Sequence, residues 1–120
     1  MIHDSHKYGV ITELRCEAEL IKRDWHVALP VLQSSAIDLI AYRDDRFVKI
    51  QVKSSISIKH NVAVVCKDFS KYENCDYIIM YDVYNRRWFI FEFKELKDVK
   101  QIALSPRKYS RNCDNWDLIR

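Results

Sequence analysis

Asp38, Gln51 and Lys53 are the candidate reactive residues in this sequence of 120 residues. They bring a carboxylate, an amide oxygen and an ammonium group. The chain has a single glycine, Gly9, so neither a GxGxxG loop nor a Walker loop can be written. Any phosphate chemistry must therefore be held by side chains or by a metal, and not by a glycine-rich cradle.

Two strand-like runs, 36–42 and 47–53, are expected to position these side chains as a β-hairpin. If the chain turns about Asp44 and Asp45, one face is wholly apolar, with the pairs Ile37–Val52, Leu39–Ile50 and Ala41–Val48. The other face then places Asp38 across from Gln51 and diagonal to Lys53. A slip of one residue would mix charged groups into the apolar face, so the pattern selects this register.

The turn and the polar face of this hairpin allow two further inferences. Because no glycine supplies the positive φ that a tight primed turn prefers, we expect a longer turn at the same point. The polar face is either a reactive cluster or an exposed pair of Asp38 and Lys53, and exposed pairs contribute only about 0 to 1 kcal/mol. Geometry alone leaves both interpretations open.

A helix over 10–25 is predicted to lie against the sheet, since its apolar residues fall on one arc at 100° per residue. These residues are Val10, Ile11, Leu14, Ala18, Ile21 and Trp25. Glu17 falls at the edge of this stripe and Glu13 just outside it. Such carboxylates are either solvated flank residues or groups that look along the core edge toward the sheet.

The remaining pattern predicts a mixed α/β or α+β fold, with one central sheet flanked by helices in a single domain over 1–120. An edge strand is expected at 26–32, a strand at 62–66 and a helical turn at 67–72. A second hairpin is expected from 76–83 and 87–93, followed by a helix at 94–101. The tail is too irregular to assign, but its aromatic residues, Trp116 among them, suggest that it docks on the domain.

Composition restricts the protein's partners only weakly. The 20 Lys and Arg residues exceed the 17 Asp and Glu residues by three, which permits an anionic partner without requiring one. Four cysteines without a CxxC pair, and a terminus without a signal-like apolar run, indicate a cytoplasmic protein with reduced thiols. No apolar run approaches the length of about 18 residues that spans a membrane, so a soluble chain is expected.

Three segments together resemble the PD-(D/E)XK nuclease superfamily, which has a restriction-endonuclease-like fold. They are Gly9-x-x-x-Glu13, Ala36-Ile37-Asp38-Leu39-Ile40 and Ile50-Gln51-Val52-Lys53. The nearest resemblance is to group I intron homing endonucleases, in which Gln replaces the acidic residue of the third motif, and archaeal Holliday junction resolvases are similar. The sequence departs from the commonest pattern at Ile37, in place of Pro, and at Gln51, in place of Asp or Glu.

The resemblance implies a site for Mg²⁺, with Mn²⁺ as a substitute. Asp38 would be the main metal ligand, helped by the side-chain oxygen of Gln51 and the backbone carbonyl of Val52. Lys53 would orient or help to deprotonate the attacking water and offset charge on the phosphate. Glu13 would bind a metal-coordinated water or a second ion, with Glu17 as the alternative.

The function implied is a metal-dependent DNA endonuclease of the homing-endonuclease or junction-resolvase type. The residues expected to contact DNA are Lys49, Ser54, Ser55, Lys59, His60, Arg107, Lys108 and Arg111. Because one chain offers one active site, a homodimer or homotetramer is expected. Two alternatives remain: a nuclease-like DNA-binding or regulatory protein in which Gln51 has weakened or abolished catalysis, and a small interaction domain with an accidental Asp–Lys face.

Overall fold

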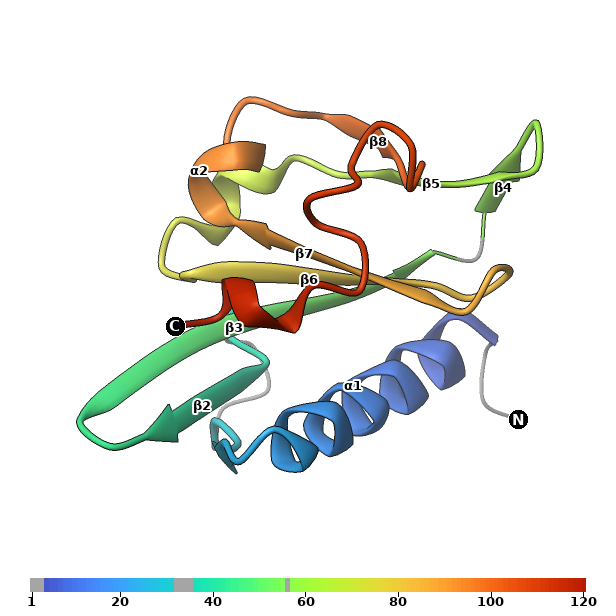
Figure 1. Cartoon of the computed structure of the whole chain (residues 1–120). Coiled ribbons are helices and arrows are strands. Elements are labelled where there is room, and N and C mark those ends of the chain that lie inside the picture. Colours follow the sequence, from blue (N-terminus) through green and yellow to red (C-terminus); the bar gives the residue numbers. More distant parts are fainter. Residues whose placement is uncertain (1–3, 32–35, 56) are drawn as a thin grey trace.

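A five-stranded sheet lies between a long helix, α1 (Asp4–Lys22), and a second sheet of three strands (Figure 1). The computed structural model describes residues 4–31, 36–55 and 57–120. In spatial order the larger sheet contains β1 (His26–Ala28), β2 (Leu39–Arg43), β3 (Arg46–Ser55), β6 (Tyr77–Asp82) and β7 (Arg87–Glu92). The smaller sheet contains β4 (Ser57–Lys59), β5 (Val62–Cys66) and β8 (Gln101–Ala103). Three short helical segments complete the fold: η1 (Phe69–Tyr72), α2 (Phe93–Leu96) and η2 (Trp116–Leu118).

The larger sheet is mixed, because β3 and β6 are parallel while its other neighbours are antiparallel. A parallel pair needs a crossover, and here β4, β5 and η1 form it. This α+β arrangement of a mixed central sheet with a flanking helix confirms the predicted fold class. None of the helices in the described ranges is both long enough and apolar enough to cross a membrane.

The register of the first hairpin is confirmed, with Leu39 opposite Ile50 and Ala41 opposite Val48. The expectation of a longer turn was wrong. Arg43 pairs with Arg46, so the turn contains only Asp44 and Asp45. Asp44 has a φ of 54°, and aspartate enters this left-handed region more readily than most residues, because its short polar side chain can hydrogen-bond locally. A glycine is therefore not needed here.

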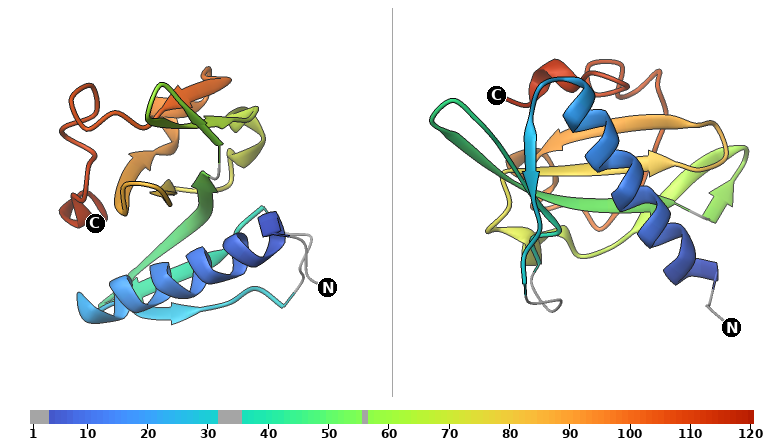
Figure 2. Two further views of the ribbon diagram at one scale, coloured as in Figure 1. Left: turned by 90° about the vertical axis from the view of Figure 1, so that its right-hand side faces the viewer. Right: turned by 90° about the horizontal axis from the view of Figure 1, so that it is seen from below.

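Successive side chains along each strand point to opposite faces of the larger sheet, and both faces are buried. Cys16 and Leu20 of α1 pack with Val48, Ile50 and Val52 on one face. The other face carries a second core, which includes Phe69, Ile78, Met80, Phe89 and Phe91 and is closed by the smaller sheet. Figure 2 shows α1 and the smaller sheet on opposite sides of β3.

The helix prediction was right in type but wrong in its start and in its buried face. α1 begins at Asp4, so Gly9 lies within the helix and not at its entry. The buried residues are Thr12, Cys16 and Leu20, whereas Val10, Leu14 and Ile21 are 43%, 59% and 59% exposed. At 3.6 residues per turn these two stripes are about 140° apart. The predicted stripe was the more apolar one, but the sheet covers the other.

Two further boundaries differ from the prediction. The segment 94–101 is not a continuous helix, because α2 ends at Leu96 and Gln101 begins β8, where it pairs with Cys66 of β5. No strand was predicted at 57–59, where the structure has β4 paired with β5. Both differences arise because the smaller sheet is assembled from short strands whose pairing partners are distant in sequence.

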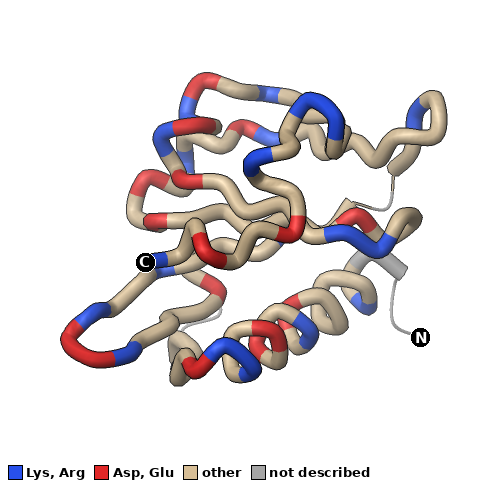
Figure 3. Tube along the Cα trace, viewed as in Figure 1, with Lys and Arg blue, Asp and Glu red and all other residues tan. Residues whose placement is uncertain are grey.

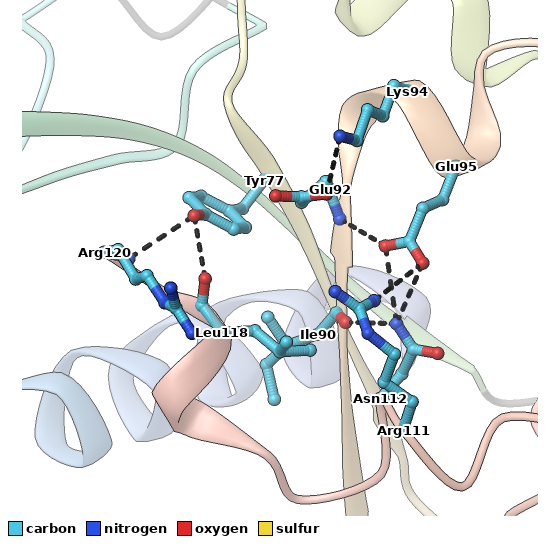
Figure 4. A network of polar contacts seen from close by, with 9 residues as sticks. All are labelled: Tyr77, Ile90, Glu92, Lys94, Glu95, Arg111, Asn112, Leu118 and Arg120. Atoms are coloured by element: carbon cyan, nitrogen blue, oxygen red, sulfur yellow. Dashed lines mark hydrogen bonds and ion pairs between the residues drawn. The ribbon is translucent and has the colours of Figure 1, made fainter.

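The tail docks along the outer edge of β7, as its aromatic residues suggested (Figure 4). The backbone N–H of Ile90 donates to Asn112 O at 3.0 Å, and Asn112 Nδ2 donates back to Ile90 O at 2.8 Å. Tyr77 Oη donates to Leu118 O at 2.8 Å, and Trp116 packs edge-on against Trp88. The tail thereby pairs backbone groups that an edge strand would otherwise leave open.

Candidate active site

The site forms where the β2–β3 ladder stops. β2 begins at Leu39, opposite Ile50, whereas β3 continues to Ser55. The backbone N–H of Asp38 donates to Ile50 O at 2.9 Å, and Asp38 Oδ2 accepts from the N–H of Val52, also at 2.9 Å. The Asp38 carboxylate thus accepts the hydrogen bond that a backbone carbonyl of a longer β2 would accept, and it is held against β3.

A cavity of about 300 Å³ at this point brings the predicted residues together. Its walls include Glu13, Asp38, Gln51, Val52 and Lys53. Glu13 comes from α1 and the other four come from the hairpin. Residues separated by up to 40 positions therefore meet around one space, and all contribute polar atoms that could face a phosphate or a cation.

Glu13 and Asp38 are close enough to share a hydrogen bond between their carboxyl groups. Burial raises the pKa of Glu13 to about 7, with further contributions from Asp38 and Glu17, while Lys53 opposes the shift. Burial also raises the pKa of Asp38, against the opposing effects of the Val52 N–H, Glu13 and Lys53. Without a cation, the two carboxyl groups therefore tend to hold a proton between them.

Lys53 and Gln51 lie beside this carboxyl pair. Burial lowers the pKa of the half-buried Lys53 ammonium, and the charges of Asp38 and Glu13 oppose that shift. Lys53 Nζ also lies 5.0 Å from the centroid of the Tyr72 ring, which holds it by a cation–π contact. Gln51 is 6% exposed, and its Nε2 donates to Val52 O at 3.3 Å.

The donor set suits a hard divalent cation. Two carboxylates, the amide oxygen of Gln51 and the carbonyl of Val52 are oxygen donors of the kind that Mg²⁺ takes. Within the described part of the chain, no three His, Cys, Asp or Glu side chains gather as a metal-binding group. That result follows from Gln51, which supplies oxygen without being a carboxylate. The raised carboxyl pKa values also indicate a place where positive charge would be favourable.

Glu13, and not Glu17, reaches the cavity. With the buried stripe centred on Cys16, Glu13 lies about 60° from its middle and Glu17 about 100°. Glu17 is half-buried and acts on Glu13 only through its charge. The resemblance named Glu13 first, but the helical wheel placed Glu17 nearer the core edge because it took the exposed stripe as the core.

The residues expected to contact DNA differ in how accessible they are. Lys49, Lys59 and His60 are exposed, and Ser54 lines the cavity. Ser55 was predicted as a DNA contact, but it is 2% exposed, and its hydroxyl lies 3.0 Å from Ser57 O and 2.8 Å from Val64 O, either of which can accept its one proton. It joins the end of β3 to β5, so its hydroxyl already has a partner within the protein.

The basic residues of the tail differ in whether they form an ion pair. Arg107 and Lys108 are exposed, but Arg111 Nη1 lies 3.2 Å from Glu95 Oε1 in an ion pair (Figure 4). Its charge is therefore already matched. Figure 3 shows basic positions in the β4–β5 turn and in the segment after β8, both on the side of the molecule that carries the smaller sheet.

Two residues near the site were not identified from the sequence. His6 lines the cavity seven residues before Glu13, on the same face of α1, and helical spacing could have found it once Glu13 was placed. Tyr72 contacts Lys53 from η1. Nothing in its local sequence distinguishes it from a core aromatic residue.

The sequence of this chain resembles those of known proteins. A family model of PD-(D/E)XK endonucleases matches residues 3–106. Protein 5.3 of Escherichia phage T7 is 24% identical over 112 residues, which is 88% of this chain and 95% of that protein.

Two solved structures have a similar fold. The bacterial homing endonuclease I-Ssp6803I has a TM-score of 0.86 and 20% identity, covering 98% of this chain and 92% of that one. The Holliday junction resolvase Hjc of Archaeoglobus fulgidus has a TM-score of 0.61 and 15% identity, covering 88% and 89% of the two chains. These likenesses confirm the restriction-endonuclease-like fold expected from the sequence.

Proposed function

Because the chain belongs to the PD-(D/E)XK endonuclease family, we propose that it is a metal-dependent DNA endonuclease that hydrolyses phosphodiester bonds. The observation that carries this proposal is the convergence of Glu13, Asp38, Gln51 and Lys53 on one cavity at the end of the β2–β3 ladder. An accidental surface pair would explain Asp38 and Lys53, but not the additional carboxyl group from α1.

We assign the metal ligands to Asp38, the side-chain oxygen of Gln51, the carbonyl of Val52 and Glu13, directly or through water. Mg²⁺ is the expected ion, with Mn²⁺ as a substitute. When bound, such an ion polarises a phosphoryl oxygen and makes water a better nucleophile. The Val52 N–H holds Asp38 in place at 2.9 Å, so this ligand is positioned before the ion arrives.

Lys53 is positioned to act on the attacking water and on the phosphate. Its ammonium group, held over the Tyr72 ring, orients the attacking water and offsets the negative charge that grows on the phosphate. Water gives up a proton as it adds to phosphorus, the bond from phosphorus to the leaving sugar oxygen breaks, and that oxygen takes up a proton. Burial has already lowered the pKa of Lys53, so this group also gives up a proton more readily than an exposed lysine.

A nicking assay on supercoiled plasmid tests this function. The wild-type protein with Mg²⁺ should cut, and Asp38→Ala, Lys53→Ala and addition of EDTA should each abolish cutting. Asp45→Asn, in the exposed turn, and Lys94→Ala, on α2, are matched controls that should cut normally. Cutting by either site variant would refute the assignment. DNA binding by a wild-type protein that never cuts would favour the catalytically inactive alternative.

The substrate type is proposed to be that of a homing endonuclease or a junction resolvase. The two classes differ in the DNA that they act on, so a linear duplex library and a four-way junction should be offered in parallel. Cleavage confined to the junction would assign the resolvase type, and cleavage at one duplex sequence the homing type.

We also propose that the protein acts as a homodimer or homotetramer. One chain supplies one cavity with these groups, and cutting both strands of a duplex takes two. Val10, Leu14 and Ile21 form an exposed apolar stripe on α1, and such a stripe is suited to a protein contact. Light scattering should give a mass above that of one chain. A monomeric mass, with double-strand cleavage first order in protein, would contradict assembly.

A further inference from the structure

A second groove, of about 340 Å³, adjoins the active-site cavity. The two share Gly9, Val52, Lys53 and Ser54 as lining residues, so they are parts of one continuous surface. The second groove continues from the end of β3 to β5 and closes at Lys67, in the segment that links β5 to η1. A ligand in the active site could therefore extend into it without leaving the surface.

Lys53 and Lys67 line this groove, and Lys71 lies near both of them. The Tyr72 ring centroid lies 5.0 Å from Lys53 Nζ and 5.3 Å from Lys71 Nζ, so these two ammonium groups are at most about 10 Å apart. Lys67 lies close enough to both that their charges lower its pKa. Three cations are thus held within roughly one Debye length of one another.

The acidic groups nearby act on Lys53 and Lys71, but none is among the charges that perturb Lys67. Asp38 and Glu13 act on Lys53, on the active-site side. Asp68 accepts hydrogen bonds from the Ser70 N–H and hydroxyl, and it also faces Lys100 Nζ at 3.9 Å. The net effect on Lys67 is repulsion, since the charges that perturb it are those of Lys53 and Lys71. Such repulsion is relieved when an anion binds.

We propose that Lys67 and Lys71 form a second phosphate-binding site, which takes a backbone phosphate of DNA beyond the one held at Asp38 and Lys53. This inference rests on the proposed function, because the groove matters as an extension of the active site. Lys67 and Lys71 are exposed, whereas Tyr72, whose ring contacts both Lys53 and Lys71, is 4% exposed. The site reads the phosphate and not the base, so its contribution is the same for every sequence.

The test is DNA binding in EDTA, where cleavage does not interfere. The probe is a fluorescent duplex of arbitrary sequence, titrated at several salt concentrations with wild type, the double variant Lys67→Ala/Lys71→Ala, and Lys94→Ala. Each lost phosphate contact lowers the slope of log affinity against log salt by about 0.9. The double variant should therefore lose about 0.9 from the slope, for one phosphate, Lys67→Arg/Lys71→Arg should keep it, and Lys94→Ala should match wild type.

The outcomes separate this site from the proposed function. An unchanged slope and affinity in the double variant would overturn the second phosphate site, whether or not the wild type cuts DNA. An equal loss in Lys94→Ala would overturn it too, since the effect would then be general charge. A selective loss in the double variant supports the site, even if the nicking assay fails. Equal melting temperatures of the variants show that the change is in binding and not in folding.

Discussion

Replacing Glu13 by Gln should make the metal-free protein more stable at neutral pH while removing activity. The carboxyl of Glu13 lies against Asp38, and its pKa rises from 4.5 to about 7 on folding. Above pH 4.5 the unfolded chain releases this proton, whereas the folded chain keeps it until about pH 7. The folded state therefore binds more protons across this window, and the contribution of Glu13 to stability falls as the pH rises from about 4.5 to 7.

The size of this effect follows from the pKa. At about 1.4 kcal/mol per pKa unit, the full change would be about 3 kcal/mol. The cavity is open to water, which screens the charge, so we expect about 1 to 2 kcal/mol. For a chain of this length, that is a rise of roughly 4 to 8 °C in the melting temperature of Glu13→Gln at pH 8. The amide of Gln can still donate to Asp38, so the variant keeps the contact and loses the charge.

The assay is thermal unfolding in EDTA at pH values from 4.5 to 8, with wild type and Glu13→Gln measured side by side. The difference between the two should be near zero at pH 4.5 and grow as the pH rises. Mg²⁺ should raise the melting temperature of wild type more than that of the variant. A variant that is less stable than wild type at pH 8, or a difference that does not depend on pH, would refute the reasoning.

Three other substitutions test separate parts of the structure. Gly9→Ala should stabilise α1 by about 0.5 to 1 kcal/mol, as measured by thermal unfolding, since a Cβ there meets nothing within 4 Å. The same variant should nick plasmid more slowly, because Gly9 lines both the active-site cavity and the second groove. Ser55→Ala should cost about 1 kcal/mol in urea unfolding, through loss of the hydrogen bond that its hydroxyl donates to Ser57 O or Val64 O, with DNA affinity unchanged. Asn112→Ala should cost about 1 to 3 kcal/mol in the same measurement, because its side chain pairs with Ile90 O and Glu95; an unchanged midpoint would show that the tail is not held there.

The register of the first hairpin could be predicted because a strand has a period of two. One slip exposes every apolar residue, so Leu39, Ala41, Val48 and Ile50 admit a single pairing. The face of α1 could not be predicted in this way. Val10, Leu14 and Ile21 form a stripe as regular as that of a core helix, and a helical wheel records the stripe without recording what covers it. Thr12 and Cys16 are small and fit close to the sheet, so the helix packs through them.

The residues of the site that lie on the paired strands of the hairpin could be predicted from the sequence. The conformation of residues 37 and 38, which lie beyond the last β2–β3 pair, could not. Ile37 was expected opposite Val52, but it packs with the second core, and Asp38 instead caps the Val52 N–H with its side chain. Lys67 and Lys71 lie on a segment that reaches the site only through the parallel crossover between β3 and β6. Long-range pairing of this kind leaves no periodic signal in the sequence.

The arrangement also gives a physical reason for the amide at position 51. Gln51 is 6% exposed, so a carboxylate in its place would be a third buried acid beside Asp38 and Glu13, which already hold a proton between them. Burying a further charge without a partner is costly, and the cost would fall on the metal-free protein. The amide supplies a hard oxygen to the site while its Nε2 donates to the Val52 carbonyl, and it avoids that charge. Gln51, in place of Asp or Glu, therefore has two effects: it attracts a cation more weakly, and it makes the metal-free protein more stable.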